Sequence, residues 1–140
     1  DKGRREFLRK WGEWIQNDSY QYPIINPKYN KGLVIENCND QFIEMLEPWF
    51  DTLYVDCDYE SYIQKEQKRT VTNLLDRLKP YDNEKQNDII VKIDTQKFTQ
   101  QDYVYINQLS AIIQDSGKIG EFELGNLKIS IIRIEEYLVS

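Results

Sequence analysis

The chain has 140 residues, of which 40% are hydrophobic and 30% charged, and a formal net charge of −6. This length and composition fit one globular domain, and no apolar run approaches the roughly 18 residues that a membrane span needs. The acidic balance disfavours a nucleic acid as partner, because binding to a phosphate backbone depends on Lys and Arg.

The first predicted element is an amphipathic helix over residues 4–17. Its apolar side chains recur at the spacing of one helical face, and they are Phe7, Leu8, Trp11, Trp14 and Ile15. Residues 1–11 carry more basic than acidic side chains, although the whole chain is acidic. We therefore expect this basic helix to pack against the acidic remainder of the chain rather than against RNA.

Within this helix lies the run Arg5-Glu6-Phe7-Leu8-Arg9-Lys10-Trp11-Gly12. It resembles the aromatic-x-x-Lys-Trp-Gly segment that closes the catalytic domain of family 2-type nucleotide-sugar glycosyltransferases of phages and bacteria. Residues 46–56, LEPWFDTLYVD, also resemble downstream segments of such proteins. The resemblance implies that a catalytic domain with its metal-binding Asp-x-Asp motif precedes Asp1, and that this chain is a C-terminal appendage. A start at Asp1 instead of Met agrees with a piece excised from a longer protein.

Residues 17–30 are predicted to form an extended linker. Pro23 and Pro27 hold the residues before them in extended conformations, and no periodicity remains. We therefore divide the chain into residues 1–30, an amphipathic helix plus linker, and residues 31–140, a single α/β domain.

A β-α-β unit is predicted for Gly32 to Asp58. The apolar runs at 33–35 and 53–55 have the length of short buried strands, and an amphipathic helical pattern lies between them. Pro48 is expected to kink or end that helix near Glu47. Two such strands joined by one helix predict a right-handed parallel crossover.

The rest of the chain continues the alternation of helices and strands. Residues 59–68 fit either a helical lead-in or a loop, and a helix is predicted over 70–79 with Pro80 as its stop. A third strand is predicted over 88–93, and a capping box at 99–102 predicts a helix that ends before Gly117. Two strands, 118–124 and 127–134, then form a hairpin about Gly125-Asn126.

This order predicts an α/β fold of three layers, Rossmann-like or methyltransferase-like. Its sheet is mostly parallel and ends in a C-terminal antiparallel hairpin, with helices on both faces.

Polar side chains follow each predicted parallel strand. In open α/β sheets ligands bind beyond the carboxyl ends of the strands. We therefore take Asn37 and Asp56 as candidates for cofactor binding, and Asp56, Asp58 and Asp94 as candidate ligands of Mg²⁺ or Mn²⁺. Asp56-Cys57-Asp58 also resembles a glycosyltransferase Asp-x-Asp motif. The alternative is that these side chains cap helices and end strands in water, without any cofactor.

Two observations weigh against a dinucleotide or a catalytic site. The corner at residues 37–40 has no glycine, so its side chains block the close backbone approach that a pyrophosphate requires. One feature of dinucleotide-binding folds is nevertheless present. Asp56 lies about twenty residues after the corner, where these folds place an acidic residue that binds a ribose hydroxyl. Histidine is absent, which removes the commonest general base.

The cysteines, Cys38 and Cys57, are predicted to be structural thiols, because no basic residue adjoins them in sequence. They lie at the ends of neighbouring predicted strands, so a disulfide between them is geometrically conceivable. The first residues are charged and lack the apolar core of a signal peptide. We therefore expect reduced thiols and a cytoplasmic location.

Two hypotheses about function follow. The first is a non-catalytic α/β accessory or interaction domain from the C-terminal part of a glycosyltransferase, bound to the rest of that chain or to another protein, and to neither nucleic acid nor membrane. The second is a small methyltransferase-like or sugar-nucleotide-dependent transferase domain that uses Asp56, Asp58 and Asp94. A partly exposed apolar N-terminal helix would favour the first hypothesis, and a cleft with converging carboxylates would favour the second.

Overall fold

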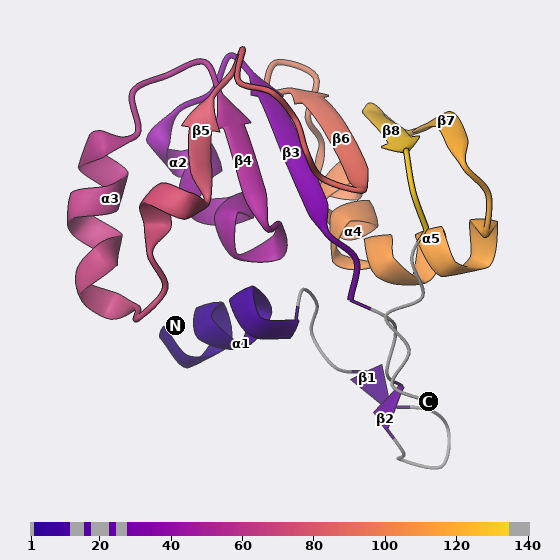
Figure 1. Ribbon diagram of the computed structural model, residues 1–140, viewed down its shortest axis with the longest axis horizontal. Coiled ribbons are helices and arrows are strands. Elements are labelled where there is room, and N and C mark those ends of the chain that lie inside the picture. Colours follow the sequence, from indigo (N-terminus) through magenta and orange to yellow (C-terminus); the bar gives the residue numbers. More distant parts are fainter. Residues whose placement is uncertain (1, 12–15, 18–22, 25–27, 135–140) are drawn as a thin grey trace.

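The computed structural model describes residues 2–11, 16–17, 23–24 and 28–134. Its main sheet has the strand order β5-β4-β3-β6-β8-β7. The strands are β3 (Lys31–Glu36), β4 (Thr52–Val55), β5 (Leu78–Pro80), β6 (Ile89–Asp94), β7 (Gly120–Leu124) and β8 (Leu127–Ile131). Strands β3 to β6 run parallel, while β8 is antiparallel to both β6 and β7 (Figure 1). This confirms the predicted mostly parallel, Rossmann-like sheet with its antiparallel C-terminal hairpin.

Five α-helices are described, together with three short 3₁₀ helices. The α-helices are α1 (Lys2–Trp11), α2 (Asp40–Leu46), α3 (Glu60–Glu66), α4 (Gln100–Asn107) and α5 (Leu109–Ser116), and the 3₁₀ helices are η1 (Glu47–Trp49), η2 (Gln67–Arg69) and η3 (Leu74–Asp76). Within the described residues, none of these helices has the length and apolar character needed to cross a membrane.

The N-terminal region differs in part from the prediction. Helix α1 covers the first part of the predicted helix, and the predicted positions Trp14 and Ile15 lie outside the described residues. In the predicted linker, β1 (Gln16–Asn17) pairs antiparallel with β2 (Pro23–Ile24) as a separate two-stranded sheet.

The β-α-β unit forms as predicted. Leu33 pairs with Leu53 and Ile35 with Val55 in parallel register. Helix α2 ends at Leu46, and Pro48 lies in the following 3₁₀ turn, because proline has no N–H with which to continue an α-helix.

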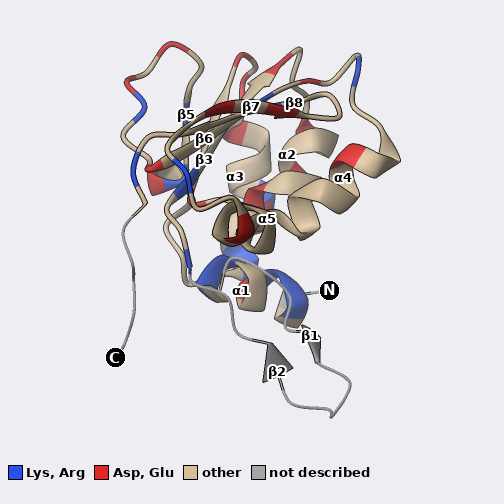
Figure 2. Ribbon diagram, turned by 90° about the vertical axis from the view of Figure 1, so that its right-hand side faces the viewer, with Lys and Arg blue, Asp and Glu red and all other residues tan. Residues whose placement is uncertain are grey.

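The main hydrophobic core lies on one face of this sheet. Figure 2 shows α2 and α4 on the same side of the strands. One buried cluster joins strand residues to residues of α2, α4 and α5, among them Leu33, Leu53, Val91, Ile43, Ile106 and Leu109.

The opposite face is covered differently from the expectation of helices on both faces. Tyr54 is buried there but lies outside the core cluster, and its hydroxyl donates a 2.7 Å hydrogen bond to Oδ1 of Asn87. Asn87 belongs to the connection 81–88 between β5 and β6. That connection is shorter than a helical crossover requires, so it crosses this face as a polar loop.

The predicted helix over 70–79 is wrong. The structure has α3 before this segment, and within it a 3₁₀ turn and strand β5. Val71 is 98% exposed and Leu75 is 58% exposed. The apolar residues at helical spacing therefore do not form one buried helical face. The amide of Gln67 instead holds the segment in a turn: Oε1 accepts a hydrogen bond from the N–H of Leu74, and Nε2 donates to the carbonyl of Thr72.

The last helical region is divided in two at Gln108, where one continuous helix was predicted. The capping box of Thr99 and Asp102 is confirmed, and Gly117 has the expected left-handed conformation with a φ of 60°. Gly125 also has a φ of 60°, in the turn between β7 and β8. The predicted hairpin is therefore confirmed.

Gly32 is expected to tolerate no side chain. A Cβ at this position would lie 2.3 Å from Oδ1 of Asn87, and Asn87 is held by hydrogen bonds with Tyr54 and Asn30. Gly32→Ala should therefore lower the free energy of unfolding by about 1–3 kcal/mol, the usual cost of overpacking, in urea titrations. The penalty should shrink in an Asn87→Ala background, and an equal penalty in both backgrounds would contradict this explanation.

Candidate functional site

The corner after β3 is the first candidate site, because it lies at the carboxyl end of the central parallel strands. Asn37 has a φ of 58°, and it is the non-glycine residue with positive φ in the described chain. Asparagine adopts this left-handed conformation more readily than most residues. The reversal at Asn37 turns the chain toward α2, whose first turn is capped by the side chain of Asn39 through the N–H of Phe42.

Asp56 closes this corner. Its Oδ2 accepts a 2.7 Å hydrogen bond from the N–H of Asn37, and its Oδ1 accepts a 2.8 Å bond from the N–H of Cys38. Both carboxylate oxygens thus bind the backbone groups that face a phosphate at the corresponding corner of dinucleotide-binding folds. The structure brings the cofactor candidates Asn37 and Asp56 together, but as partners of each other. Their role in cofactor binding stays a prediction.

Asp94, at the end of β6, binds the same corner from its other side. Its Oδ1 accepts hydrogen bonds from Nδ2 of Asn37 at 2.9 Å and from the N–H of Gln96 at 3.0 Å. These bonds lower the pKa of Asp94. The hydroxyl of Thr95 donates to the carbonyl of Asn37 at 2.6 Å. The ends of β3 and β6 are therefore joined through Asn37.

Asp58 and Asp40 serve the start of α3. Oδ1 of Asp58 accepts a 2.9 Å hydrogen bond from the N–H of Glu60, and Asp40 accepts a 2.7 Å bond from the hydroxyl of Ser61. Asp58 thus binds a backbone N–H at the start of α3, Asp40 links α2 to α3, and the residue that caps a helix here is Asn39.

No group of three or more Cys, Asp or Glu side chains in the described residues is arranged to hold a metal ion. The structure therefore does not bring Asp56, Asp58 and Asp94 together as a set of ligands for Mg²⁺ or Mn²⁺. Each carboxylate instead accepts hydrogen bonds from backbone N–H groups: Asp56 from the corner after β3, Asp58 from the start of α3, and Asp94 from the turn after β6.

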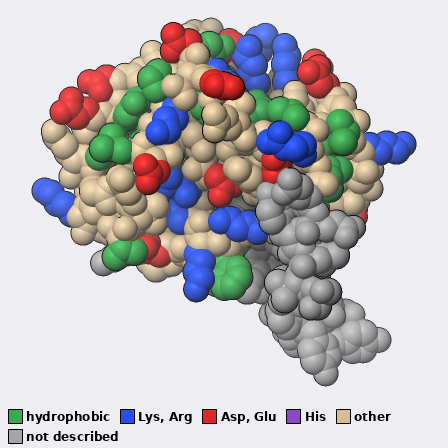
Figure 3. Space-filling view, in the orientation of Figure 1, with side chains coloured by type: hydrophobic (Ala, Val, Ile, Leu, Met, Phe, Trp, Pro, Cys, Tyr) green, Lys and Arg blue, Asp and Glu red, His purple; other side chains and the backbone are tan. Residues whose placement is uncertain are grey.

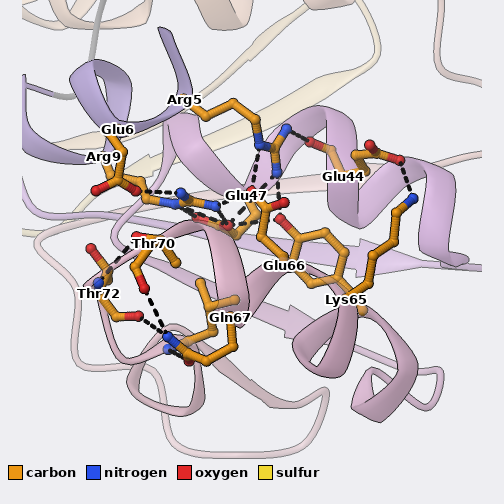
Figure 4. Close-up of polar contacts among 12 residues, drawn as sticks. Arg5, Glu6, Arg9, Glu44, Glu47, Lys65, Glu66, Gln67, Thr70 and Thr72 are labelled. Atoms are coloured by element: carbon orange, nitrogen blue, oxygen red, sulfur yellow. Dashed lines mark hydrogen bonds and ion pairs between the residues drawn. The ribbon is translucent and has the colours of Figure 1, made fainter. Parts of the chain in front are cut away.

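A second polar cluster joins α1 to the rest of the domain, and its members lie too far apart in the sequence to be recognised as partners there. Figure 4 shows Arg5 and Arg9 of α1 directed toward Glu47 and Glu66. Nη2 of Arg9 lies 2.6 Å from both Oε1 of Glu47 and Oε2 of Glu66, and Nε of Arg5 lies 2.6 Å from Oε2 of Glu66. The expectation that the basic helix packs against the acidic body is confirmed.

Glu47 is the centre of this arginine–glutamate cluster. Its side chain is fully buried and also accepts hydrogen bonds from Nε of Arg77 at 2.9 Å and from the hydroxyl of Tyr62 at 2.8 Å. Burial alone would raise the pKa of Glu47, but the hydrogen bond from Arg9 and the charges of Arg77 and Arg9 outweigh burial and lower it. Burial and the charge of Glu47 raise the pKa of Tyr62. The cluster is thus a set of charges that hold one another ionised in the interior.

Two hollows adjoin these sites. One of about 110 Å³ lies beside Asp94 and combines basic and acidic walls, including Lys92, Lys97, Lys128 and Glu36. Figure 3 likewise shows Lys and Arg side chains interleaved with Asp and Glu over one face of the molecule. The other hollow, about 410 Å³, lies between α1 and α2 and is lined by Leu8, Met45, Pro48, Trp49, Tyr103, Arg4, Arg5, Gln41 and Glu44. It is partly apolar and borders the cluster.

No family model, no curated protein and no solved structure matches this chain.

Proposed function

We propose that this chain is a non-catalytic α/β accessory domain that binds another protein or another part of a longer chain, in a protein related to glycosyltransferases. The observation that carries the proposal is the position of Asp56. Its carboxylate accepts the N–H groups of Asn37 and Cys38, so the corner where a Rossmann-like fold places its nucleotide is closed by the chain itself.

The surface around α1 supports an interaction role. Trp11 is 50% exposed and packs against Phe7 with their ring centroids 6.3 Å apart. The hollow between α1 and α2 adds Met45 and Tyr103 to this region. Protein–protein contacts typically contain partly exposed aromatic side chains on a helix that is firmly attached to its domain. The buried pairs of Arg9 with Glu47 and Glu66 provide that fixation.

The glycosyltransferase relation rests on the resemblance of residues 5–12. In the structure this segment supplies Arg5 and Arg9 to the buried cluster. We therefore propose that α1 connects this domain to the part of the protein that carries catalysis.

A thermal-shift panel tests the proposal. The midpoint of unfolding is measured with S-adenosylmethionine, a UDP-sugar and Mn²⁺, and none is expected to change it. A ligand present at 100 times its Kd would add about 2.7 kcal/mol to the stability of the folded state, which raises the midpoint by several degrees. A shift of that size in the wild type that is lost in Asp56→Asn would refute the accessory role and favour the transferase hypothesis.

A further inference from the structure

The two cysteines lie at the ends of two paired strands. β3 and β4 are parallel neighbours, with Ile35 opposite Val55 as the last registered pair. Cys38 and Cys57 follow these strands within a few residues. Both cysteines therefore lie at the same edge of the sheet, at the carboxyl ends of adjacent strands.

Asp56 keeps the two chain ends together beyond the strands. Its Oδ1 accepts the N–H of Cys38 at 2.8 Å, and Asp56 itself immediately precedes Cys57. A direct link therefore joins the backbone of one cysteine to the residue next to the other.

Both cysteines are free, partly buried and packed against the main core. The thiol of Cys38 donates a 3.5 Å hydrogen bond to the carbonyl of Asn39, and the two sulfurs are close enough for each to affect the pKa of the other. Among the described residues, the charged groups that affect the pKa of the pair include Asp40, Asp56 and Asp58, and each of these carboxylates accepts a hydrogen bond.

We propose that Cys38 and Cys57 form a dithiol site that is reversibly oxidised to an intramolecular disulfide by a small-molecule disulfide such as oxidised glutathione. This inference goes beyond the proposed function and does not depend on it.

The reaction balances as two thiol–disulfide exchanges. The thiolate of Cys57 attacks one sulfur of oxidised glutathione, which forms a mixed disulfide and releases one glutathione thiolate. The thiolate of Cys38 then attacks the sulfur of Cys57, and the second glutathione leaves. Two electrons pass from the protein sulfurs to glutathione, and the two thiol protons end on the two glutathione molecules. Cys57 acts first because burial raises the pKa of the Cys38 thiol further than that of Cys57.

The reaction is expected to be slow at neutral pH and faster in base. Burial raises the pKa of both thiols, and the neighbouring carboxylates Asp56, Asp40 and Asp58 add to this for Cys57. Because the thiolate is the attacking species, the rate should rise by up to about tenfold per pH unit while the pH stays below these pKa values.

The test incubates the folded protein with oxidised glutathione and then counts thiols by maleimide labelling under denaturing conditions, together with intact mass. The wild type should lose both thiols and two hydrogen atoms of mass, with no glutathione retained, and dithiothreitol should restore both thiols. Cys38→Ser and Cys57→Ser are the matched controls. Cys38→Ser should stop at the mixed disulfide, because the second attack has no thiol.

Three outcomes would overturn the proposal. They are two thiols that stay labelled, glutathione that stays attached to the wild type, and a bridge that forms as fast in urea as in the folded protein. The last comparison separates a site built by the fold from two cysteines that meet at random. The oxidised protein should also unfold at a temperature several degrees higher, because the bridge closes the loop 38–57 in the unfolded chain.

Discussion

Glu47→Ala is expected to lower the free energy of unfolding by about 3–5 kcal/mol, the cost of breaking a buried ion pair from one side. The substitution removes the shared partner of Arg9 and Arg77, two guanidinium groups that are themselves buried. It also leaves the hydroxyl of Tyr62 without its acceptor. Urea unfolding followed by tryptophan fluorescence measures the loss.

A surface ion pair on the same region provides the control. Glu44 and Lys65 lie 3.8 Å apart with side chains 50% and 62% exposed, and such pairs contribute about 0–1 kcal/mol. Glu44→Ala should therefore be nearly neutral. If Glu47→Ala cost as little as Glu44→Ala, the buried cluster would not be what holds α1 to the domain.

The same cluster predicts a loss of stability in acid. Burial raises the pKa of Glu47 and Glu66, but hydrogen bonds and charges from Arg9, together with Arg77 at Glu47 and Arg5 at Glu66, bring both pKa values below the ordinary 4.5. A group whose pKa is lower in the folded state contributes stability above its unfolded pKa and loses it as the pH falls through the folded pKa. Stability should thus decline below about pH 4.5, and the difference between wild type and Glu47→Ala should narrow there. A constant difference down to pH 2 would contradict this account.

The fold was predictable where a local pattern determines it. The β-α-β unit follows from two short apolar runs with one helix between them, and the start of α4 follows from Thr99 and Asp102. The segment 70–79 was not predictable in this way. Val71 and Leu75 fit the spacing of a helix, but this spacing does not indicate that both side chains are exposed to solvent.

The candidate site was predictable only by location. The sequence indicates the correct edge of the sheet for Asn37, Asp56 and Asp94, because residues after parallel strands meet there. It does not indicate that Asp56 turns toward the backbone, since this depends on the positive φ of Asn37.

The arginine–glutamate cluster could not be found in the sequence either. Arg9 and Glu47 are 38 positions apart, and Arg9 and Glu66 are 57 positions apart. Arg5 and Arg9 are four positions apart, which places them on one face of the basic helix. This spacing indicates that they bind acidic groups, but it does not show which residues supply those groups.

Asp102 joins two distant elements, and its removal is the second large effect that we expect. Its Oδ2 accepts the N–H of Thr99 at 2.9 Å and Nδ2 of Asn126 at 3.0 Å, and its Oδ1 accepts the N–H of Asn126 at 3.0 Å. The residue is 1% exposed. One carboxylate therefore caps α4 and holds the turn between β7 and β8 against it.

Asp102→Ala should lower the free energy of unfolding by about 2–4 kcal/mol. About 1 kcal/mol is the usual value of a helix cap, and about 1–3 kcal/mol comes from the two hydrogen bonds that Asn126 donates to this charged acceptor. Thr99→Ala is the control for the cap alone, because it removes one bond to the N–H of Asp102 and leaves the turn intact. In a double-mutant cycle in urea, Asp102→Ala and Asn126→Ala should be coupled by more than about 0.5 kcal/mol. Additive effects would mean that the helix and the hairpin are stabilised independently, since residues that share no interaction contribute separately to stability.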